Sequence, residues 1–324
     1  MKAVRVVTLD GPSAVEVAEV DEPAANDARV EIEVHAAGVT FPDVLLTRGL
    51  YQLRPDPPFT PGSEVAGVVR RAPDGGAPKA GDRVAAMLGV GAFAEVVSAD
   101  PEQVLPLPEG VTFEVGAALP MNYLTVHFAL TKRGHLRPGE TVLVHGAAGG
   151  IGTAAIQMAL ALGASRVIGV VSSEAKAEVA RAAGAHDAIL VDGFKDQARQ
   201  LTGGRGVDVV VDPVGGDRFT DSLRSLATEG RVLVLGFTGG EIPTVKVNRL
   251  LLNNVDVVGV GWGAYASMNR GYFQEQWAEI LPLLEAGKLN PIISGTYPLE
   301  RAGEAIAELE ERRVTGKVLL KLRD

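Results

Sequence analysis

A buried strand that runs into a glycine-rich turn and then into a helix constrains the fold of this chain more than any other feature. Residues 141–145 read Thr-Val-Leu-Val-His, residues 146–152 include four glycines, and a helical pattern follows over residues 152–162. Glycines let the backbone approach a pyrophosphate closely, and the first amides of a helix favour an anion. The segment therefore predicts a dinucleotide-binding turn. The alternative is a tight strand–helix turn that needs glycine for steric reasons alone.

From residue 141 onward, strand-like and helical runs alternate. Most of the strand-like runs are nearly continuous in Val, Ile and Leu, which is typical of parallel strands covered on both faces. A second helix is predicted over residues 173–183. Six strands with crossover helices make a doubly wound α/β sheet, and we expect this domain to occupy residues 119–264. Its strands are predicted at residues 141–145, 166–171, 188–192, 207–212, 231–236 and 255–260.

The chain before residue 119 predicts a different architecture, made of short strands and turns. In residues 29–36 the apolar Val30, Ile32 and Val34 alternate with polar side chains, which indicates a half-buried strand. We expect a partly open β-barrel or a curled antiparallel sheet. Its further strands are predicted at residues 66–71, 83–87 and 94–97.

The residues from 265 onward are too few for a core of their own. They predict helices at 271–286 and 299–313 and a strand at 317–322. We expect this tail to pack on the N-terminal part, so that residues 1–118 and 265–324 form one discontinuous domain. The face that the second helix would bury consists of Ala302, Ala305, Ile306 and Leu309.

Composition excludes several classes of function. The 31 basic and 40 acidic residues give a formal net charge of -9, which argues against nucleic acid and anionic membrane surfaces as partners. The absence of cysteine excludes disulfides, a thiol nucleophile, iron–sulfur clusters and cysteine-ligated zinc. It is compatible with a reducing cytoplasm, where we expect the protein. Residues 1–20 lack the continuous apolar run of a signal peptide, and no apolar stretch is long enough to span a bilayer.

The end of the second predicted strand bears on the choice of dinucleotide. A site that prefers NAD usually places Asp or Glu there, to bind the ribose 2′-hydroxyl. This chain has Ser172 and Ser173 instead, with Lys176 one helical turn further on, and this set suits the 2′-phosphate of NADPH. The alternative is that Ser173 only caps the helix and Lys176 is solvated.

Together, these segments resemble the medium-chain dehydrogenase/reductase superfamily, in its zinc-independent quinone oxidoreductase branch. The resemblance covers the whole chain and implies a GroES-like catalytic domain, a Rossmann domain, a cleft between them, NADPH and a homodimer. We expect the dimer to form across the edge strand at residues 255–260, because an open apolar edge invites pairing. The segments that carry the resemblance are residues 36–46, 49–52, 58–67, 81–84, 147–152, 212–216 and 315–317.

The resemblance also implies the residues that contact the cofactor. Thr40 departs from the family's usual Asn beside the nicotinamide, and Asp192 stands where many members have a Tyr near the adenine. The pyrophosphate residues are Gly149, Gly150, Ile151 and Gly152, and those at the 2′-phosphate are Ser172, Ser173 and Lys176. The remaining contacts are Thr40, Thr125, Gly236, Phe237, Val260, Trp262 and Lys317.

The residues also argue against a bound metal. In zinc-dependent relatives a His precedes the glutamate that Glu64 matches, whereas this chain has Ser63 there. Cysteine ligands are absent, and the five histidines show no close-set pair. We therefore expect a metal-free protein, in which Glu64 shapes the site.

The function that this reading predicts is hydride transfer from NADPH to a quinone or an α,β-unsaturated carbonyl. Tyr51 is the candidate catalytic residue, because a phenol can donate a hydrogen bond to a developing enolate and give up its proton. The alternative role for Tyr51 is an aromatic wall against flat substrates. Two other functions stay open: an enoyl-thioester reductase, and an NADPH-binding protein without catalysis.

Overall fold

The computed structural model describes residues 1–76 and 78–323, and these form two compact units. The first unit comprises Met1–Met121, Arg270–Trp277 and Ile293–Asp324. The second comprises Asn122–Asn269 and Ala278–Ile292. Most of the tail thus joins the N-terminal part, while residues 278–292 belong to the second unit. The domain boundaries at residues 118 and 264 stay predictions.

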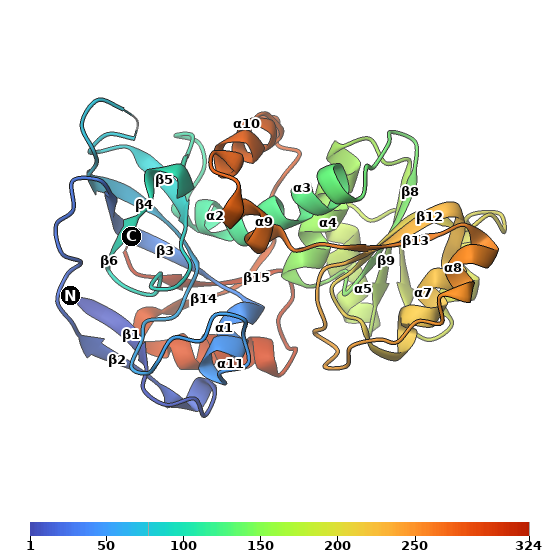
Figure 1. Ribbon diagram of the computed structural model, residues 1–324, viewed down its shortest axis with the longest axis horizontal. Helices are drawn as coiled ribbons and strands as arrows, with labels where there is room; N and C mark the ends of the chain where they lie inside the picture. Colours follow the sequence, from blue (N-terminus) through green and yellow to red (C-terminus); the bar gives the residue numbers. More distant parts are fainter. Residues whose placement is uncertain (77, 324) are drawn as a thin grey trace. The chain divides into compact units, whose positions relative to one another are not determined.

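The second unit is built on a six-stranded sheet in which every pair of neighbours is parallel (Figure 1). The strand order is β10-β9-β8-β11-β12-β13, so the first strand in the chain lies at the centre and the path reverses beside it. This order is that of a doubly wound dinucleotide-binding sheet, and it confirms the predicted fold class. The strands are β8 (Thr141–His145), β9 (Arg166–Val171), β10 (Asp187–Leu190), β11 (Val207–Asp212), β12 (Leu226–Val234) and β13 (Asp256–Gly259).

Helices cover both faces of this sheet, which explains why its central strands are almost wholly apolar. Helices α4 and α5 contact each other on β8 and β9, whereas α6 and α7 contact each other beside β10 and β12. Leu143, Ile168, Val210 and Val232 are completely buried between these layers. The helices are α3 (Thr125–Phe128), α4 (Gly150–Ala161), α5 (Glu174–Ala182), α6 (Phe194–Leu201), α7 (Phe219–Ser225), α8 (Asn248–Asn253) and α9 (Trp262–Met268).

The first unit is built on a seven-stranded sheet that is antiparallel except where β14 pairs with β15. The C-terminal strand β15 pairs with β3, which joins the tail to the N-terminal part. A separate hairpin consists of β1 (Lys2–Val6) and β2 (Val15–Glu19). The sheet strands are β3 (Val30–Val39), β4 (Glu64–Arg71), β5 (Arg83–Met87), β6 (Val96–Ala99), β7 (Val104–Pro106), β14 (Ile293–Pro298) and β15 (Lys317–Lys321).

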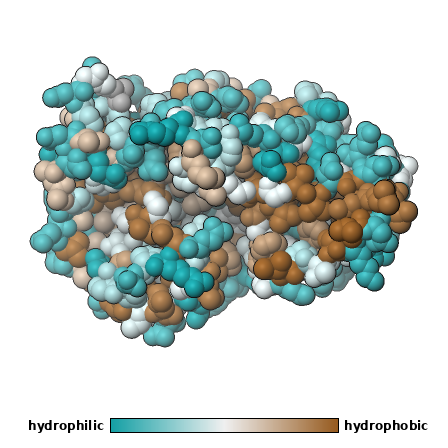
Figure 2. Space-filling view, in the orientation of Figure 1, coloured by the Kyte–Doolittle hydropathy of each residue, from teal (hydrophilic) through white to brown (hydrophobic). Residues whose placement is uncertain are grey.

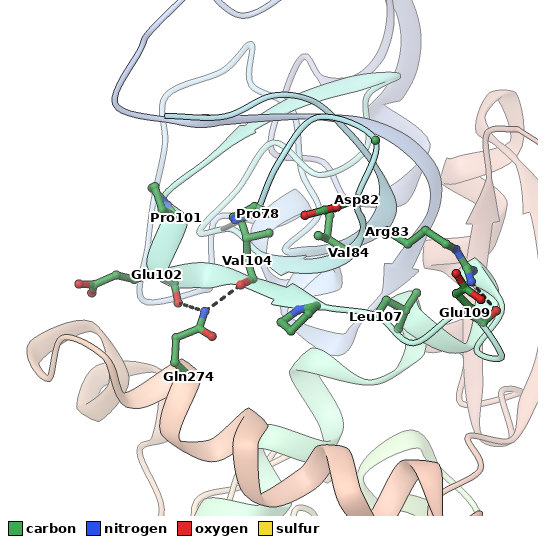
Figure 3. Close-up of a pocket in the computed structure, with 12 residues that line it drawn as sticks. Pro78, Asp82, Arg83, Val84, Pro101, Glu102, Val104, Leu107, Glu109 and Gln274 are labelled. Atoms are coloured by element: carbon green, nitrogen blue, oxygen red, sulfur yellow. Dashed lines mark hydrogen bonds between the residues drawn. The ribbon is translucent and has the colours of Figure 1, made fainter. Parts of the chain in front are cut away.

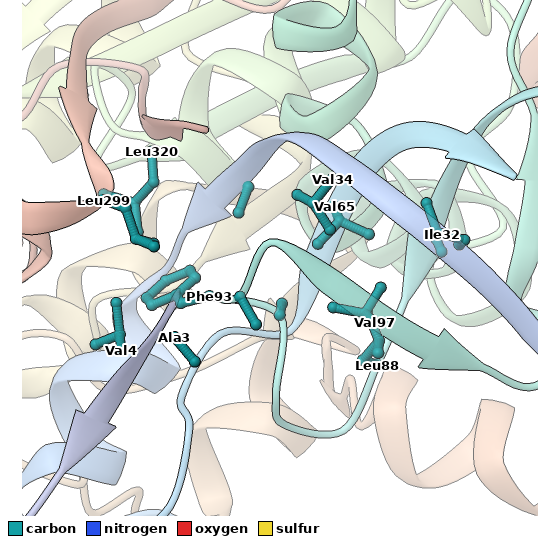
Figure 4. Packing of buried hydrophobic residues seen from close by; sticks show 14 of the residues in the cluster. Ala3, Val4, Ile32, Val34, Val65, Leu88, Phe93, Val97, Leu299 and Leu320 are labelled. Carbon is teal, nitrogen blue, oxygen red and sulfur yellow. The ribbon is translucent and has the colours of Figure 1, made fainter. Parts of the chain in front are cut away.

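The core of the first unit gathers side chains from the hairpin, the sheet and the tail (Figure 4). Phe93 is completely buried among aliphatic residues such as Ile32 and Val65. Helix α11 (Ala302–Glu310) adds its apolar face to this core. Ala302, Ala305 and Ile306 are buried there and Leu309 packs against them, as the periodicity of the helix predicts. The remaining helices of the unit are α1 (Phe41–Thr47) and α2 (Phe113–Ala118).

Strand β7 lies at the edge of this sheet, where unpaired carbonyls would invite another strand. The N-terminal part of α10 (Tyr272–Glu285) covers it instead. Gln274 Nε2 donates to the carbonyl oxygens of Glu102 (3.1 Å) and Val104 (2.7 Å), and Trp277 Nε1 donates to that of Pro106 (2.9 Å). Side-chain donors thus satisfy this edge.

Membrane-spanning segments are not found among the helices of residues 1–76 and 78–323, none of which has the length and apolar character that a crossing requires.

Replacing Ile306 by Ala tests whether the tail is part of the first unit's core. Ile306 is completely buried, so Ile306→Ala should lower the free energy of unfolding by about 2–5 kcal/mol in urea denaturation. Leu50→Ala is the matched control, because Leu50 of the same unit is 64% exposed and its replacement should change stability by less than about 0.5 kcal/mol. Equal losses in the two variants would contradict this role for the helix.

Candidate functional site

The turn between β8 and α4 has the geometry of a phosphate-binding turn. Gly146 adopts a left-handed conformation with φ of 58°, and the amide of Gly149 donates to its carbonyl oxygen at 2.9 Å. A Cβ on Gly152 would lie 2.6 Å from Cα of Ala147, closer than real Cβ atoms approach. Only glycine therefore lets α4 start this close to the turn. The helix begins at Gly150, so the amides of its first turn have no carbonyl one turn earlier to bind.

The end of β9 places the three predicted 2′-phosphate residues at the start of α5. Ser172 and Ser173 are exposed and Lys176 is half-buried. The hydroxyl oxygen of Ser173 accepts a hydrogen bond from the amide of Lys176 at 3.4 Å, so Ser173 does cap the helix. Capping uses the hydroxyl oxygen and leaves the hydroxyl hydrogen for an acceptor.

The loops after β11 and β12 are bonded to each other at the same edge of the sheet. The amide of Leu235 donates to the carbonyl of Asp212 at 2.9 Å, and that of Gly239 donates to the carbonyl of Val214 at 2.8 Å. Phe237, in the second loop, is 37% exposed and lies so near Gly215 that a Cβ there would contact its ring at 2.8 Å. These contacts fix the loop that contains Gly236 and Phe237.

The other predicted residues of the second unit are placed separately. Val260 follows β13, and its amide donates to the carbonyl of Val234 at 3.0 Å. Trp262 is buried at the start of α9, and Thr125 is half-buried at the start of α3. Asp192 is exposed beyond the end of β10.

In the first unit, a buried carboxylate organises the start of α1. Asp43 is completely buried and accepts hydrogen bonds from the amide (2.8 Å) and hydroxyl (2.7 Å) of Thr40. It also accepts one from the amide of Gly62 at 3.0 Å. Burial raises the pKa of Asp43 to about 6, although these hydrogen bonds and the charge of Lys317 act in the opposite direction. Thr40, which is 4% exposed and caps α1, is thus held in place by Asp43.

A second buried carboxylate, Glu64, holds Lys317. The Lys317 ammonium donates to Glu64 Oε1 and is only 4% exposed, while Glu64 is completely buried. The other oxygen, Oε2, accepts from the amide of Met121 at 2.7 Å. A Cβ on Gly38 would collide with this carboxylate, so strand β3 needs glycine beside it. Glu64 therefore joins β4, β15 and the segment just beyond α2 by paired charge and hydrogen bonds.

Tyr51 lies just beyond α1, half-buried against a small cluster of Val6, Leu46 and Phe59. Partial burial raises the pKa of its phenol, and the nearby Asp43 carboxylate raises it further. The phenol therefore stays protonated at neutral pH and can donate a hydrogen bond. Electrostatic interactions link Asp43 to Tyr51 and to Lys317, and hydrogen bonds link it to Thr40. Asp43 is thus the common neighbour of all three residues predicted for this unit.

The sequence did not identify Asp43 as a site residue. Its signal was present, because Thr40 and Asp43 have the three-residue spacing of a capping box and Pro42 sits in the first turn of the helix. The contact with Gly62, 19 residues away, has no sequence signature.

A groove of about 790 Å³ on the first unit lies apart from these residues (Figure 3). It is bounded by Arg83, Glu102, Val104, Glu109 and Gln274, among others, and contains none of the predicted site residues. Gln274 is occupied with the backbone of Glu102 and Val104, as the dashed lines of Figure 3 show. A search of residues 1–76 and 78–323 for three or more His, Asp or Glu side chains that could hold a metal found no such group. That no zinc is bound stays a prediction.

Comparison with known proteins assigns the chain to a family. The family model described as "Alcohol dehydrogenase GroES-like domain" matches residues 26–109, and that described as "Zinc-binding dehydrogenase" matches residues 150–286. Human quinone oxidoreductase is 33% identical over 330 residues, which cover 99% of this chain and 98% of the human protein. The chain belongs to the quinone oxidoreductase branch of the medium-chain dehydrogenase/reductase superfamily. The predicted family and the predicted GroES-like and Rossmann folds are confirmed.

Solved structures of similar proteins agree with this assignment. A probable oxidoreductase from Mycobacterium abscessus is 44% identical with a TM-score of 0.92, and 99% of each chain is covered. The quinone oxidoreductase of Escherichia coli, solved with NADPH, is 31% identical with a TM-score of 0.91 and covers 99% of this chain and 100% of its own. Rat quinone oxidoreductase-like protein 2 is 39% identical over 91% of this chain and 85% of its own length.

The pH dependence of stability should report the buried carboxyl of Asp43. Its folded-state pKa of about 6 lies above the ordinary 3.8, so the folded protein binds a proton more tightly than the unfolded chain. Asp43 therefore contributes most to stability below pH 4, and this contribution is lost as the pH rises through 6. In urea denaturation, the stability of the wild type relative to Asp43→Asn should fall by roughly 2.4 kcal/mol between pH 4 and pH 7. A difference that stays constant over this range would refute the raised pKa.

Proposed function

We propose that this protein is an NADPH-dependent oxidoreductase that reduces a quinone or an α,β-unsaturated carbonyl. The single observation that carries the proposal is the start of α4 against the glycine-rich turn, at the carboxyl end of the central strand β8. In open parallel sheets, the crevice beside the point where the strand order reverses is where dinucleotides bind. Membership of the quinone oxidoreductase branch supports the class of substrate.

The residues at this edge fit a dinucleotide. The first-turn amides of α4 point the positive end of the helix dipole toward an anion, and a glycine at position 152 permits the close approach. We assign the pyrophosphate to Gly149, Gly150, Ile151 and Gly152. The 2′-phosphate is assigned to Ser172, Ser173 and Lys176. Further contacts are assigned to Thr40, Thr125, Gly236, Phe237, Val260, Trp262 and Lys317.

When bound, NADPH supplies a hydride to the electron-poor carbon of the substrate. The protein then has to stabilise the negative charge that develops on the substrate oxygen and to supply a proton. We assign this task to Tyr51, because its phenol is protonated at neutral pH and can donate a hydrogen bond to the developing oxyanion and then its proton.

A substrate panel tests the function as a whole. Consumption of NADPH is followed by its absorbance with a simple quinone, an enone and an enoyl-CoA. Turnover of the quinone or the enone supports the proposal. Preferential turnover of the enoyl-CoA would favour an enoyl-thioester reductase, and NADPH binding without any turnover would favour a non-catalytic protein.

Replacing Lys176 by Ala tests the cofactor preference. A contact between the ammonium and a 2′-phosphate is charge-assisted, so Lys176→Ala should weaken NADPH binding about tenfold or more and leave NADH binding nearly unchanged. Fluorescence titration with each cofactor gives both affinities. Lys288→Ala, which alters an exposed lysine of the same unit, is the control and should change neither. Equal losses for NADPH and NADH would refute the assignment of Lys176.

Replacing Tyr51 by Phe separates its two roles. If the phenol donates the proton, Tyr51→Phe should lower kcat with an enone by about 100-fold or more, because Phe has no donor. If Tyr51 is only an aromatic wall, Tyr51→Phe should change little while Tyr51→Ala raises KM. Full activity of Tyr51→Phe with both quinones and enones would refute the catalytic role.

We also propose a homodimer across the edge strand β13. On the second unit, apolar side chains lie exposed around this strand and α8, in the brown area at the right of Figure 2. Because β13 pairs only with β12 in the described sheet, its outer edge can pair with a second copy of the chain. The exposed apolar residues are Ile242 (71% exposed), Val247 (75%), Leu251 (76%), Leu252 (74%) and Val257 (39%).

A charge placed in this patch should dissociate the dimer. Sedimentation at micromolar concentration should show a dimer for the wild type and a monomer for Val257→Asp, because the carboxylate would be buried without a partner. Val7→Asp is the matched control, since Val7 is 37% exposed on the first unit and its replacement should leave the dimer intact. A monomeric wild-type protein would refute the proposal.

A further inference from the structure

A buried polar cluster lies directly behind the glycine-rich turn, at the carboxyl ends of β8 and β11. His145 ends β8 and Asp212 ends β11. Because Val144 pairs with Val211, these two residues are neighbours in the sheet, and their side chains point to the same face. Both are completely buried, as is Ser222 of α7. The ring of Phe194 meets the His145 ring edge-on, with centroids 4.8 Å apart.

In this cluster, His145 Nε2 and the Ser222 hydroxyl both have hydrogen-bond partners. His145 Nε2 lies 2.8 Å from Ser222 Oγ, and that hydroxyl donates to the carbonyl of Arg218 at 3.3 Å. The hydrogen bond from Ser222 to Arg218 favours the tautomer in which Nε2 carries the ring proton and donates it to Oγ. In this tautomer His145 is neutral and its Nδ1 is bare. Burial lowers the pKa of His145 to about 4, which agrees with a neutral ring.

The rest of the cluster is left with three polar atoms that have no hydrogen-bond partner among residues 1–76 and 78–323. They are Nδ1 of His145, Oδ2 of Asp212 and Nε of Arg218, and each is inaccessible to solvent. His145 and Asp212 are neighbours in the sheet, and Ser222 contacts both His145 and the carbonyl of Arg218, so the three residues lie in one neighbourhood. Burying such atoms without partners costs free energy, so native proteins commonly satisfy them with an internal water.

We propose that His145, Asp212 and Arg218 bind one internal water molecule. The water accepts a hydrogen bond from Arg218 Nε and donates its two protons to Asp212 Oδ2 and His145 Nδ1. Every proton in the cluster then has one acceptor. Two acceptors and one donor match the capacity of a single water, and no ion is needed.

The site would act as a positioning device for the two loops beside it. His145 precedes Gly146, the first residue of the glycine-rich turn. Asp212 Oδ1 accepts from the amides of Val214 and Gly215, both at 2.9 Å, and Gly215 contacts the Phe237 loop. The water thus connects the turn after β8 to the turn after β11. This consequence rests on the proposed function, in which the glycine-rich turn and the Phe237 loop beside Gly215 contact the dinucleotide, whereas the water site itself does not.

The ring tautomer of His145 tests the water site without any cofactor. In ¹⁵N NMR of the histidine-labelled protein, assigned by the signal that His145→Gln removes, we expect a neutral ring protonated at Nε2. A proton on Nδ1 would overturn this hydrogen-bond pattern. A crystal structure that resolves ordered waters and has none between His145 Nδ1, Asp212 Oδ2 and Arg218 Nε would overturn the water site.

Two replacements of His145 test the positioning role, because each keeps one side of the ring. The amide of His145→Asn mimics the Nδ1 position and keeps a partner for the water, whereas that of His145→Gln mimics Nε2 and keeps only the bond to Ser222. His145→Gln should raise the Kd for NADPH about tenfold, and His145→Asn should raise it less than about threefold. Ser222→Ala should lower stability and leave the Kd nearly unchanged.

The outcomes separate this proposal from the proposed function. Equal Kd values for His145→Asn and His145→Gln, or a Kd that follows stability across the three variants, would overturn the positioning role. If the wild-type protein does not bind NADPH, the proposed function fails together with the positioning role, while the crystal structure still decides whether the water is bound.

Discussion

The arrangement of the second unit depends on one close contact, between the start of α4 and the turn that precedes it. Without a side chain at Gly152, the helix begins almost against the backbone of Ala147. This fixes the direction of the helix axis and brings its first amides to the carboxyl end of the central strand. A side chain at residue 152 would push α4 away from this turn, and the N-terminal end of the helix dipole would then no longer lie at that edge. The dinucleotide site proposed at this edge would therefore be a consequence of backbone packing, with the side chains around it selecting the ligand.

In the first unit, buried carboxylates rather than a close backbone contact hold the chain segments in place. Asp43 and Glu64 are completely buried, and each binds a backbone amide from a distant part of the chain: Asp43 that of Gly62, and Glu64 that of Met121. Hydrogen bonds from amides offset part of the desolvation of a carboxylate, and in Glu64 the ammonium of Lys317 offsets more. Asp43 has no such direct counter-ion, which explains why its pKa rises although it accepts three hydrogen bonds. The unit thus holds its loops through groups that are costly to bury.

The sequence predicted the features that depend on local residue patterns, and it missed those that depend on contacts between residues far apart in the chain. The bounds of β8, β9 and β11 agree with prediction, because continuous Val, Ile and Leu runs report burial on both faces. Strand β12 begins at Leu226 instead of residue 231, since Glu229 with φ of 64° and Gly230 read as a turn in sequence but continue the strand in the fold. Helices α1 and α2 were not predicted, because they are short and owe their stability to tertiary contacts, α1 with α11 and α2 with β3 and β4. The partners of Asp43 and Glu64 were hidden for the same reason, as tertiary hydrogen bonds leave no periodicity.

Lys317 shows how a structural role and a predicted binding role can belong to one residue. Its ammonium is buried against Glu64, and an ammonium so placed is stable only beside a carboxylate. The pair with Glu64 uses only part of the hydrogen-bonding capacity of the Lys317 ammonium, because an ammonium has three N–H donors and one carboxylate oxygen accepts from one of them. What the pair fixes is the position of the charge, since Glu64 is in turn fixed by the amide of Met121. A lysine on a mobile stem would lose side-chain entropy on binding an anion, whereas one already held in place has lost it on folding. For the predicted contact with the cofactor, the buried pair thus holds Lys317 in place beforehand, and it also attaches the strand β15 to the sheet.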